Sequence, residues 1–425
     1  MIKRAQYACV IGVILALSLV VRVSQVMHAE AGAVPGPLVA VQSSAAVAPV
    51  VPFRISVPDR VLQDLKARLG RTRFLDEIPG SGWVYGTDLT YMKQLVSYWR
   101  DKFNWRTQEQ RLNRFPQFKT NIDGLDIHFI HQRANTANAI PLVLLHGYPD
   151  SFVTFTKVID ALVDPASHGG QPGEAFHVVV PSLPGYGFSG RPRQHGWGVA
   201  RAAAAVTALM ARLGYTRYAV QGGGLGCAVA TRMALEDRAH VVGLHVNDCP
   251  VPAPPGNPDA GVPPADLQRM RAREAELVDE QAYLEMNSTK PDTSGYELVD
   301  SPIGLAAWIV DKYRAWCDCN GTPDKKFTKD DLLTNIMVYW VTETGASAGR
   351  IYRESRREVK VSGKVETPTA VAVFPKNMTL PPRRWMEARY NVTRWTEMPR
   401  GGHFAALEEP ELFVGDVRAF FRALR

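Results

Sequence analysis

The chain has 425 residues, of which 46% are hydrophobic and 21% charged, as is usual for a globular protein with one large core and an inserted or appended domain. Its net charge of +7 is spread along the sequence, with no long basic run and no interleaving of basic and aromatic residues. We therefore expect no nucleic-acid partner and regard the charge as a solubility feature.

The N-terminus has the features of a targeting segment. Basic residues precede an apolar run at residues 7–21, and a small-x-small cleavage motif ends at Ala31. The run is about 15 residues long, shorter than the roughly 20 residues of a spanning helix. We expect residues 1–31 to be a cleaved export signal, or else an uncleaved membrane anchor, and only an anchor would bring the protein to a membrane. Residues 32–52, rich in Ala, Val, Pro and Ser, are expected to form a disordered leader.

Residues 53–115 are expected to form a helical N-terminal domain. Apolar side chains recur at helical spacing, as at Leu62, Leu65 and Leu69, and aromatic residues are dense. This pattern is typical of helices that pack on a later domain.

From residue 116 the pattern changes to short β-type runs separated by helical stretches. The first two runs alternate and are linked through Asp123-Gly124, which predicts an antiparallel hairpin at the sheet edge. Most later runs are uniformly apolar, as in a parallel sheet covered on both faces. The eight predicted strands are Phe118–Ile122, Leu125–Gln132, Leu142–His146, His177–Pro181, Tyr218–Val220, Val241–Val246, Thr369–Phe374 and Asn391–Met398.

These runs predict an α/β fold with a mostly parallel, eight-stranded sheet. Its core spans residues 116–249 and 367–425. The mostly helical stretch at 250–366 is expected to form a cap over the carboxyl edge of the sheet, where ligands bind in such folds.

Four cysteines follow the predicted signal, and we expect them to be free thiols. Cys317 and Cys319 are too close in sequence for an easy bridge, and Cys227 could pair with Cys249 only if their strands are neighbours. No histidine cluster with zinc spacing accompanies them. We expect neither a metal nor a cofactor.

A glycine-rich turn at residues 222–226 lies between a predicted strand and a predicted helix. This is the context of a nucleophile elbow. The positions two before and two after the nucleophile must be small, and they are Gly222 and Gly226. The nucleophile position itself is Gly224, which has no side chain. The frame of a hydrolase site is present without its reactive atom.

Two further motifs fit the same kind of site. The turn His146-Gly147-Tyr148-Pro149 follows the third predicted strand, and the amides of Tyr148 and Leu225 could converge as an oxyanion hole. The alternative is a plain Gly-Pro turn. His403 follows the last strand, where the base comes in the chain order nucleophile, acid, histidine.

Together these motifs resemble the microsomal-type epoxide hydrolases from about Pro52 to the C-terminus. The resemblance implies an N-terminal helical domain, an α/β-hydrolase core and a helical cap. Its most specific stretches are His146–Pro149, Pro184–Ser189, Ser288–Pro291, Asp330–Asn335 and Arg400–Pro410.

In that family an Asp at the elbow attacks an epoxide to give an ester, and a histidine–acid pair activates the water that cleaves it. Two cap tyrosines hold the epoxide oxygen. By position these tyrosines are Tyr283 and Tyr352, whose phenols can donate a hydrogen bond to a developing alkoxide. The resemblance implies a small hydrophobic epoxide as ligand.

The sequence departs from the family at two positions. Gly224 replaces the nucleophilic Asp, and Asn377 stands where the triad acid is expected. Asp248, at the end of the sixth predicted strand, is a candidate substitute acid, although it could instead cap the linker to the cap. Asn377 could also orient His403, since amides are third members of some triads.

Three functions remain open at this stage. The first is hydrolysis of an epoxide by water that His403 activates directly, with Asp248 as its acid. The second is a non-catalytic protein that binds small hydrophobic ligands. The third is another reaction that uses the His–Asp pair, such as a lyase or cyclisation step. The oligomeric state stays open.

Overall fold

The computed structural model describes residues 48–136, 138–359 and 362–425, so the predicted signal and residues 32–47 of the predicted leader lie outside the described residues. The strands are β1 (Val51–Phe53), β2 (Gln117–Ile122), β3 (Leu125–Gln132), β4 (Ile140–Leu145), β5 (Phe176–Pro181), β6 (Tyr218–Gly223), β7 (Val241–Asn247), β8 (Val365–Val373) and β9 (Tyr390–Glu397). In the described chain no helix is long and apolar enough to cross a membrane.

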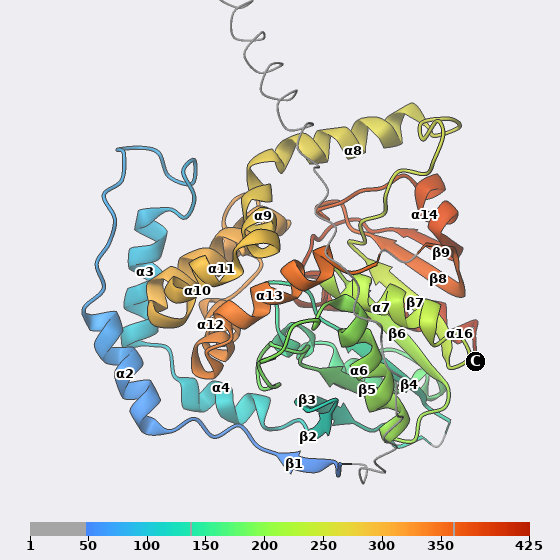
Figure 1. Cartoon of the computed structure of the whole chain (residues 1–425), viewed down its shortest axis with the longest axis horizontal. Helices are drawn as coiled ribbons and strands as arrows, with labels where there is room; N and C mark the ends of the chain where they lie inside the picture. Colours follow the sequence, from blue (N-terminus) through green and yellow to red (C-terminus); the bar gives the residue numbers. More distant parts are fainter. Residues whose placement is uncertain (1–47, 137, 360–361) are drawn as a thin grey trace, which may run out of the picture. The chain divides into compact units, whose positions relative to one another are not determined.

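These strands form one sheet in the order β1-β2-β3-β5-β4-β6-β7-β8-β9 (Figure 1). The pairs β1–β2, β2–β3 and β3–β5 are antiparallel, and all later pairs are parallel. The predicted α/β-hydrolase fold is confirmed, and each of the eight predicted runs overlaps a strand, three of them extending one residue beyond its end. The sheet of the described chain has nine strands, however, so the predicted number is wrong.

The additional strand comes from the end of the predicted leader. Val51–Phe53 pairs with the outer edge of β2, so the β2–β3 hairpin is not the edge of the sheet. Phe53 packs against Phe188 and His128, with ring centroids 5.3 and 5.2 Å apart. Residues 51–52 are thus ordered by main-chain pairing and by the burial of the neighbouring aromatic ring, which the composition of the segment does not reveal.

β8 begins earlier than predicted, at Val365 inside the expected cap. Pro368 has no N–H group for the sheet, and prolines usually mark the limits of strands. Here a register shift between Val365 and Pro368 accommodates the proline within the strand. The cap therefore ends before residue 366.

The helices are α2 (Asp59–Gly70), α3 (Leu89–Asp101), α4 (Trp105–Leu112), α5 (Ile159–Val163), α6 (Val199–Arg212), α7 (Leu225–Glu236), α8 (Pro264–Glu276), α9 (Ala282–Thr289), α10 (Pro291–Asp300), α11 (Pro302–Trp316), α12 (Lys329–Thr342), α13 (Gly345–Arg356), α14 (Arg383–Arg389), α15 (Ala405–Glu408) and α16 (Pro410–Arg422). Helices α6 and α7, which contact each other, cover the near face of the sheet in Figure 1. On β7, Gly243 and His245 face α16 instead: a Cβ at Gly243 would meet Phe421, and His245 hydrogen-bonds Asp416. The sheet is thus covered on both faces, and its central strand β4 is fully buried from residue 142 to 145.

Helices α8 to α13 lie between β7 and β8 in the chain and are braced by the N-terminal helices (Figure 1). Helices α2 and α3 contact α11, and α3 and α4 contact α12. Hydrogen bonds add to this packing: the hydroxyl of Tyr91 donates to Asp324 at 2.7 Å and that of Tyr98 to Asp330 at 3.0 Å. The N-terminal helices therefore help to hold the cap helices in place.

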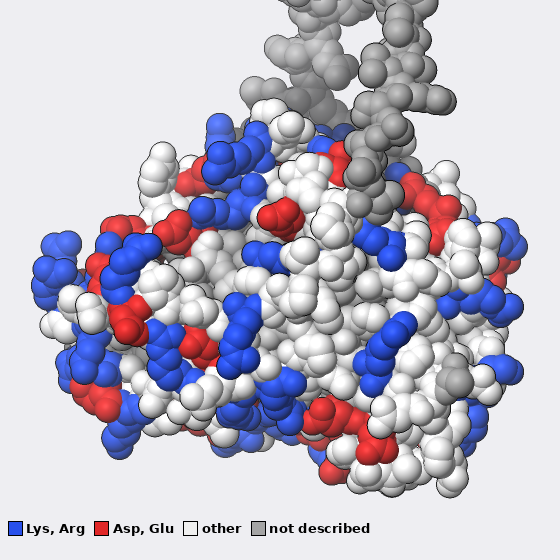
Figure 2. Space-filling model, turned by 90° about the horizontal axis from the view of Figure 1, so that it is seen from below, with Lys and Arg blue, Asp and Glu red and all other residues white. Residues whose placement is uncertain are grey.

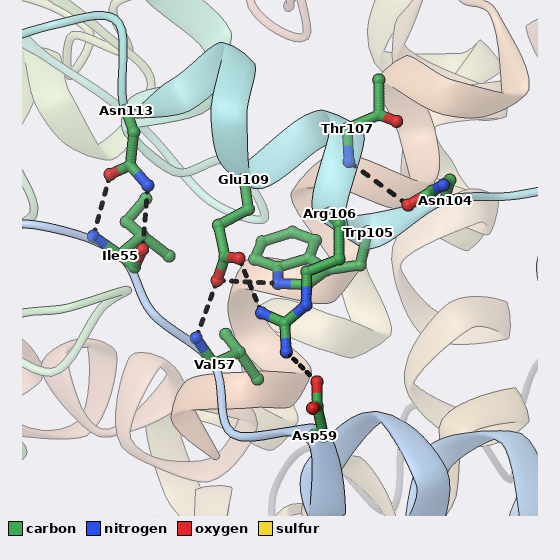
Figure 3. A network of polar contacts seen from close by, with 9 residues as sticks. All are labelled: Ile55, Val57, Asp59, Asn104, Trp105, Arg106, Thr107, Glu109 and Asn113. Carbon is green, nitrogen blue, oxygen red and sulfur yellow. Dashed lines mark hydrogen bonds and ion pairs between the residues drawn. The ribbon is translucent and has the colours of Figure 1, made fainter.

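A polar network fastens the N-terminal segment to α4 (Figure 3). The Glu109 carboxylate accepts from the Val57 amide at 2.7 Å and from the Arg106 guanidinium at 2.6 Å. The Asn113 side chain exchanges two hydrogen bonds with the backbone of Ile55, at 2.9 and 2.8 Å. These bonds satisfy backbone groups between β1 and α2, where no secondary structure does so.

The four cysteines expected to be free thiols form two disulfides, Cys227–Cys249 and Cys317–Cys319, so that expectation is wrong. Their Cα atoms are 5.6 and 5.3 Å apart, a normal spacing for a bridge. Strands β6 and β7 are neighbours, which brings the start of α7 and the end of β7 together. The other pair closes within the turn after α11.

Charged side chains of both signs share the surface. On the face in Figure 2, Lys and Arg side chains are interspersed with Asp and Glu. Arg68, for example, pairs with Asp64 at 2.8 Å and with Asp300 at 2.9 Å. On this face the net positive charge is not gathered into one patch.

The glycines of the turn after β6 are required by close backbone contacts. A Cβ at Gly222 would collide with the carbonyl group of Gly226, and a Cβ at Gly226 would collide with the carbonyl group of Leu145 in β4. The turn therefore fixes α7 directly against the central strands.

We predict that Gly226→Ala lowers the free energy of unfolding by about 2 kcal/mol or more, because backbone must move to admit the methyl group. Gly415→Ala in α16 is the matched control, since nothing lies within 4 Å of the added Cβ. It should be neutral or stabilising, by up to about 1 kcal/mol. Chemical denaturation followed by circular dichroism measures both. Equal stability of the two variants would contradict this account of the turn.

Candidate active site

Gly224 retains the backbone conformation of an elbow although it has no side chain. It precedes α7 with φ 55° and ψ −123°, a conformation that L side chains rarely adopt. A Cβ built on Gly224 would lie 2.8 Å from Cε1 and 3.4 Å from Nε2 of His403. The imidazole therefore stands directly over the nucleophile position, against the space where a side chain would begin.

His403 is held by a buried hydrogen bond from its Nδ1 to the carboxylate of Asp248. The side chains of both residues are almost fully buried, at 4% and 2% exposed. The His403 amide also donates to the carbonyl oxygen of Trp316 at 3.0 Å, and the two rings pack edge to face with centroids 5.2 Å apart. Ring and backbone are thus both fixed, with the Cε1–Nε2 edge of the ring facing the elbow.

Asp248 connects the histidine to two further segments. Its carboxylate accepts hydrogen bonds from the amides of Met378 and Thr379 at 3.0 and 2.9 Å. Its carbonyl oxygen accepts from the amide of Gly224 at 3.0 Å. Asp248 also has a positive φ of 45°, which Asp tolerates better than most residues. Asp248 therefore does more than cap the linker that leads to the helical cap.

Asn377, the other candidate for orienting the histidine, does not bond its Nδ1. The Asn377 side-chain oxygen is buried and meets no donor among the described residues. Its backbone carbonyl accepts from the guanidinium of Arg273 at 2.9 Å. The geometry therefore pairs His403 with Asp248 and not with Asn377.

In the pKa values of His403 and Asp248, the attraction between the two groups outweighs the effect of their burial. Burial lowers the pKa of His403, but the neighbouring Asp248 carboxylate raises it above the ordinary 6.5. Burial raises the pKa of Asp248, but the charge and hydrogen bond of His403 and two backbone amides hold it below 3.8. The His403 contribution to stability is therefore complete below pH 6.5 and is lost as the pH rises through the folded pKa. The Asp248 contribution is present above pH 3.8 and is lost as the pH falls.

The cap places Tyr283 of α9 and Tyr352 of α13 around the ring of Tyr148. Tyr148 stacks on Tyr283 with centroids 5.9 Å apart and meets Tyr352 edge to face at 5.6 Å. Tyr283 also packs on Trp316 at 5.0 Å, and Trp316 packs on His403. The two predicted tyrosines are therefore joined to the histidine through one continuous group of rings.

Burial raises the pKa of Tyr352 well above its ordinary value, with further contributions from nearby tyrosines. The pKa of Tyr283 is also raised, chiefly by burial and then by Asp248. Both phenols therefore remain protonated across the physiological range and can act as hydrogen-bond donors.

The turn after β4 lies against the elbow, as an oxyanion hole requires. A Cβ on Gly147 would lie 3.6 Å from the Leu225 nitrogen and 3.7 Å from Nε2 of His403. Tyr148 follows directly, so the two amides predicted to converge come from adjoining segments. His146 supports the turn: its Nε2 accepts from the Leu183 amide at 3.1 Å, and burial lowers its pKa to about 4.

Four residues of the site were not singled out from the sequence. Trp316 links a tyrosine to His403, and Trp308 donates to the hydroxyl of Tyr148. Burial raises the pKa of Asp150 to about 6 and that of Glu408 to about 7, with His403 acting against burial in both cases. Asp150 follows the His146–Pro149 turn directly, which is a signal; the others have none in the sequence. Among the described residues no cluster of His, Cys, Asp and Glu is arranged to hold a metal.

The fold, the elbow and the buried His–Asp pair define an α/β-hydrolase. Residues 50–155 match the family model described as epoxide hydrolase N terminus, and residues 140–284 match that of the alpha/beta hydrolase fold. A relative from Stigmatella aurantiaca is 43% identical over 377 residues, 88% of this chain and 86% of its own. Epoxide hydrolase 1 of Sus scrofa is 38% identical over 402 residues, 88% of each chain.

Solved structures agree. The crystal structure of juvenile hormone epoxide hydrolase from the silkworm Bombyx mori matches with a TM-score of 0.81 and 31% identity, covering 89% of this chain and 95% of that one. The chain therefore belongs to the epoxide hydrolase family.

We predict that Asp248→Asn lowers the pKa of His403 by about 1 unit or more, because the negative charge that stabilises the imidazolium is removed. Titration of the ring C–H resonances by NMR, assigned with His403→Gln, measures the shift. For any reaction that needs neutral His403, the acidic limb of the pH–rate profile should then move to lower pH.

Asn377→Ala is the control and should leave the pKa of His403 unchanged. A linker-capping role for Asp248 predicts instead a stability loss of about 1 kcal/mol with the pKa of His403 unaltered. A shift in Asn377→Ala beside none in Asp248→Asn would reverse the assignment of the acid.

Proposed function

We propose that this protein hydrolyses a small hydrophobic epoxide to a diol, by direct attack of a water molecule that His403 activates. The observation that carries the proposal is the position of the imidazole. Nε2 lies 3.4 Å from the point where the side chain of residue 224 would begin. A water bound to Nε2 would therefore stand beside the position of the family's carboxylate, and no covalent ester is needed.

In the proposed step, the water oxygen forms a bond to an epoxide carbon while the C–O bond of the epoxide ring breaks. One water proton passes to Nε2 of His403, and the ring oxygen, which gains the electron pair, is protonated through the tyrosine hydroxyls. The Asp248 carboxylate stabilises the imidazolium that forms, as the acid of a triad does. Return of the imidazolium proton to solvent, and transfer of a proton from solvent to the tyrosine oxygen that protonated the alkoxide, restore the neutral imidazole and the neutral phenol.

Tyr283 and Tyr352 support this assignment over a role in ligand binding alone. Tyr283 is buried and Tyr352 half-buried, and both phenols are protonated and connected to the ring group next to His403. A donor placed where negative charge develops contributes far more in a buried site than in water. A protein that only bound an apolar ligand would have no need of these paired donors beside a buried histidine–carboxylate pair.

The loss of the nucleophile favours the second candidate, a non-catalytic protein that binds small hydrophobic ligands in the same site. The absence of a side chain at Gly224 is the specific observation behind it. A different reaction of the His–Asp pair, such as a lyase step, would leave the substrate without added water. Product analysis separates all three.

We predict turnover of styrene oxide to its diol, with His403→Gln lowering the rate roughly 10²- to 10⁴-fold. Tyr352→Phe and Tyr283→Phe should each lower kcat/KM roughly tenfold or more, because a donor to the developing alkoxide is lost. Chromatographic measurement of the diol gives all three rates.

Tyr98→Phe is the matched control, since that hydroxyl bonds Asp330 in the packing between α3 and α12. It should leave kcat/KM unchanged. Saturable binding of styrene oxide without any diol, in the folded wild-type protein, would replace hydrolysis with the ligand-binding function.

A further inference from the structure

A small cavity lies beside His403, between the carboxyl ends of β4, β6 and β7 and the start of α15. Its volume is about 20 Å³. A cavity of that size holds one water if it offers two to four polar partners. The polar residues in its lining are His146, Asp150, Thr154, Gln221, Asn247 and His403.

Gln221 provides a buried acceptor in this lining. The residue is 1% exposed and stands on β6, directly before the glycine turn. Its Nε2 donates to the side-chain oxygen of Asn247 at 2.9 Å. Its Oε1 is buried and has no donor within the described parts of the chain. Buried amide oxygens normally have a donor, and a bound water is the usual one where protein supplies none.

Asp150 provides a second acceptor. It is 5% exposed, and its Oδ1 accepts from the hydroxyl of Tyr313 at 2.9 Å. Its backbone carbonyl accepts from Tyr339 at 2.6 Å, so the segment is fixed from two cap helices. A carboxylate has room for several donors.

The cavity is adjacent to the catalytic nitrogen. Gly147 and Gly223 belong to its lining, and a Cβ on Gly147 would lie 3.7 Å from Nε2 of His403 and 3.2 Å from the Gly223 oxygen. A water at this place therefore has amide and carboxylate acceptors on one side and the imidazole on another.

We propose that this cavity is a water-binding site, in which Gln221 and Asp150 are positioning residues that hold the water His403 activates. The existence of the site is independent of the reaction, whereas its role as source of the attacking water rests on the proposed function. With one hydrogen directed to Nε2 and the other shared between the oxygens of Gln221 and Asp150, the water presents its oxygen to the epoxide carbon. It then forms the C–O bond as its proton passes to the imidazole.

The test combines a high-resolution crystal structure of the wild-type protein with kinetics of Gln221→Leu, which keeps the size of the side chain and removes the acceptor. We expect an ordered water in the wild-type cavity. For styrene oxide, Gln221→Leu should lower kcat roughly 10- to 100-fold with little change in KM, because the water is displaced from Nε2 while the ligand site is intact. Gln221→Glu, which retains an acceptor, should recover much of the rate and move the acidic limb of the pH profile to higher pH.

Gln117→Leu is the matched control: it removes another buried glutamine, which bonds His128 and the Leu112 carbonyl away from the site. Its kcat should stay within twofold of wild type. If the wild-type cavity contains no ordered water, the proposed water site is wrong, and this result does not depend on whether the variants fold. Unchanged kcat in Gln221→Leu overturns its catalytic role while leaving the proposed function intact. An ordered water in a protein that forms no diol supports the site and overturns the proposed function.

Discussion

The buried pair of His403 and Asp248 is the interaction on which the arrangement of the site depends. Asp248 directly follows β7. Its carboxylate accepts from His403 and from two amides after β8, while its carbonyl oxygen accepts from the amide of Gly224. One residue thus fixes the elbow, the base and the β8 loop relative to each other. Because the pair is buried, removing one partner leaves an uncompensated charge, which is costly. The neighbouring strands β6, β7 and β8 provide the rigid base that this geometry requires.

In the turn after β6, the backbone keeps the conformation of a nucleophile elbow although residue 224 has no side chain. Packing against β4 still dictates glycine at positions 222 and 226, and Gly224 keeps its positive φ. The imidazole lies so close that an Asp at 224 would require His403 to move. The turn around Gly224 is therefore not arranged to receive a carboxylate without further change. It places the His403 imidazole over the position that lacks a side chain, next to tyrosines that the cap and the N-terminal helices hold in place.

Much of this could be predicted from the sequence, because parallel strands, the glycine turn and the order of motifs are local patterns. His403 was identified in this way, and Tyr283 and Tyr352 through the resemblance to the family; the structure brings all three into one group of rings. Features that depend on distant pairing could not be predicted. β1 is ordered by a partner more than 60 residues away, and the disulfides depend on which strands are neighbours and on how the chain turns after α11. The roles of Trp316 and Asp150 likewise follow from packing between elements and not from any spacing.

The central claim is that water attacks the epoxide directly, without an ester on the protein. Single-turnover hydrolysis of styrene oxide in water enriched in oxygen-18, with protein in excess, tests it most directly. The account predicts a diol that carries one labelled oxygen and a protein that carries none, as shown by mass spectrometry of both. An unlabelled diol together with label in a carboxyl group of the protein would contradict it, because that pattern marks a covalent ester formed by a carboxylate and cleaved by solvent.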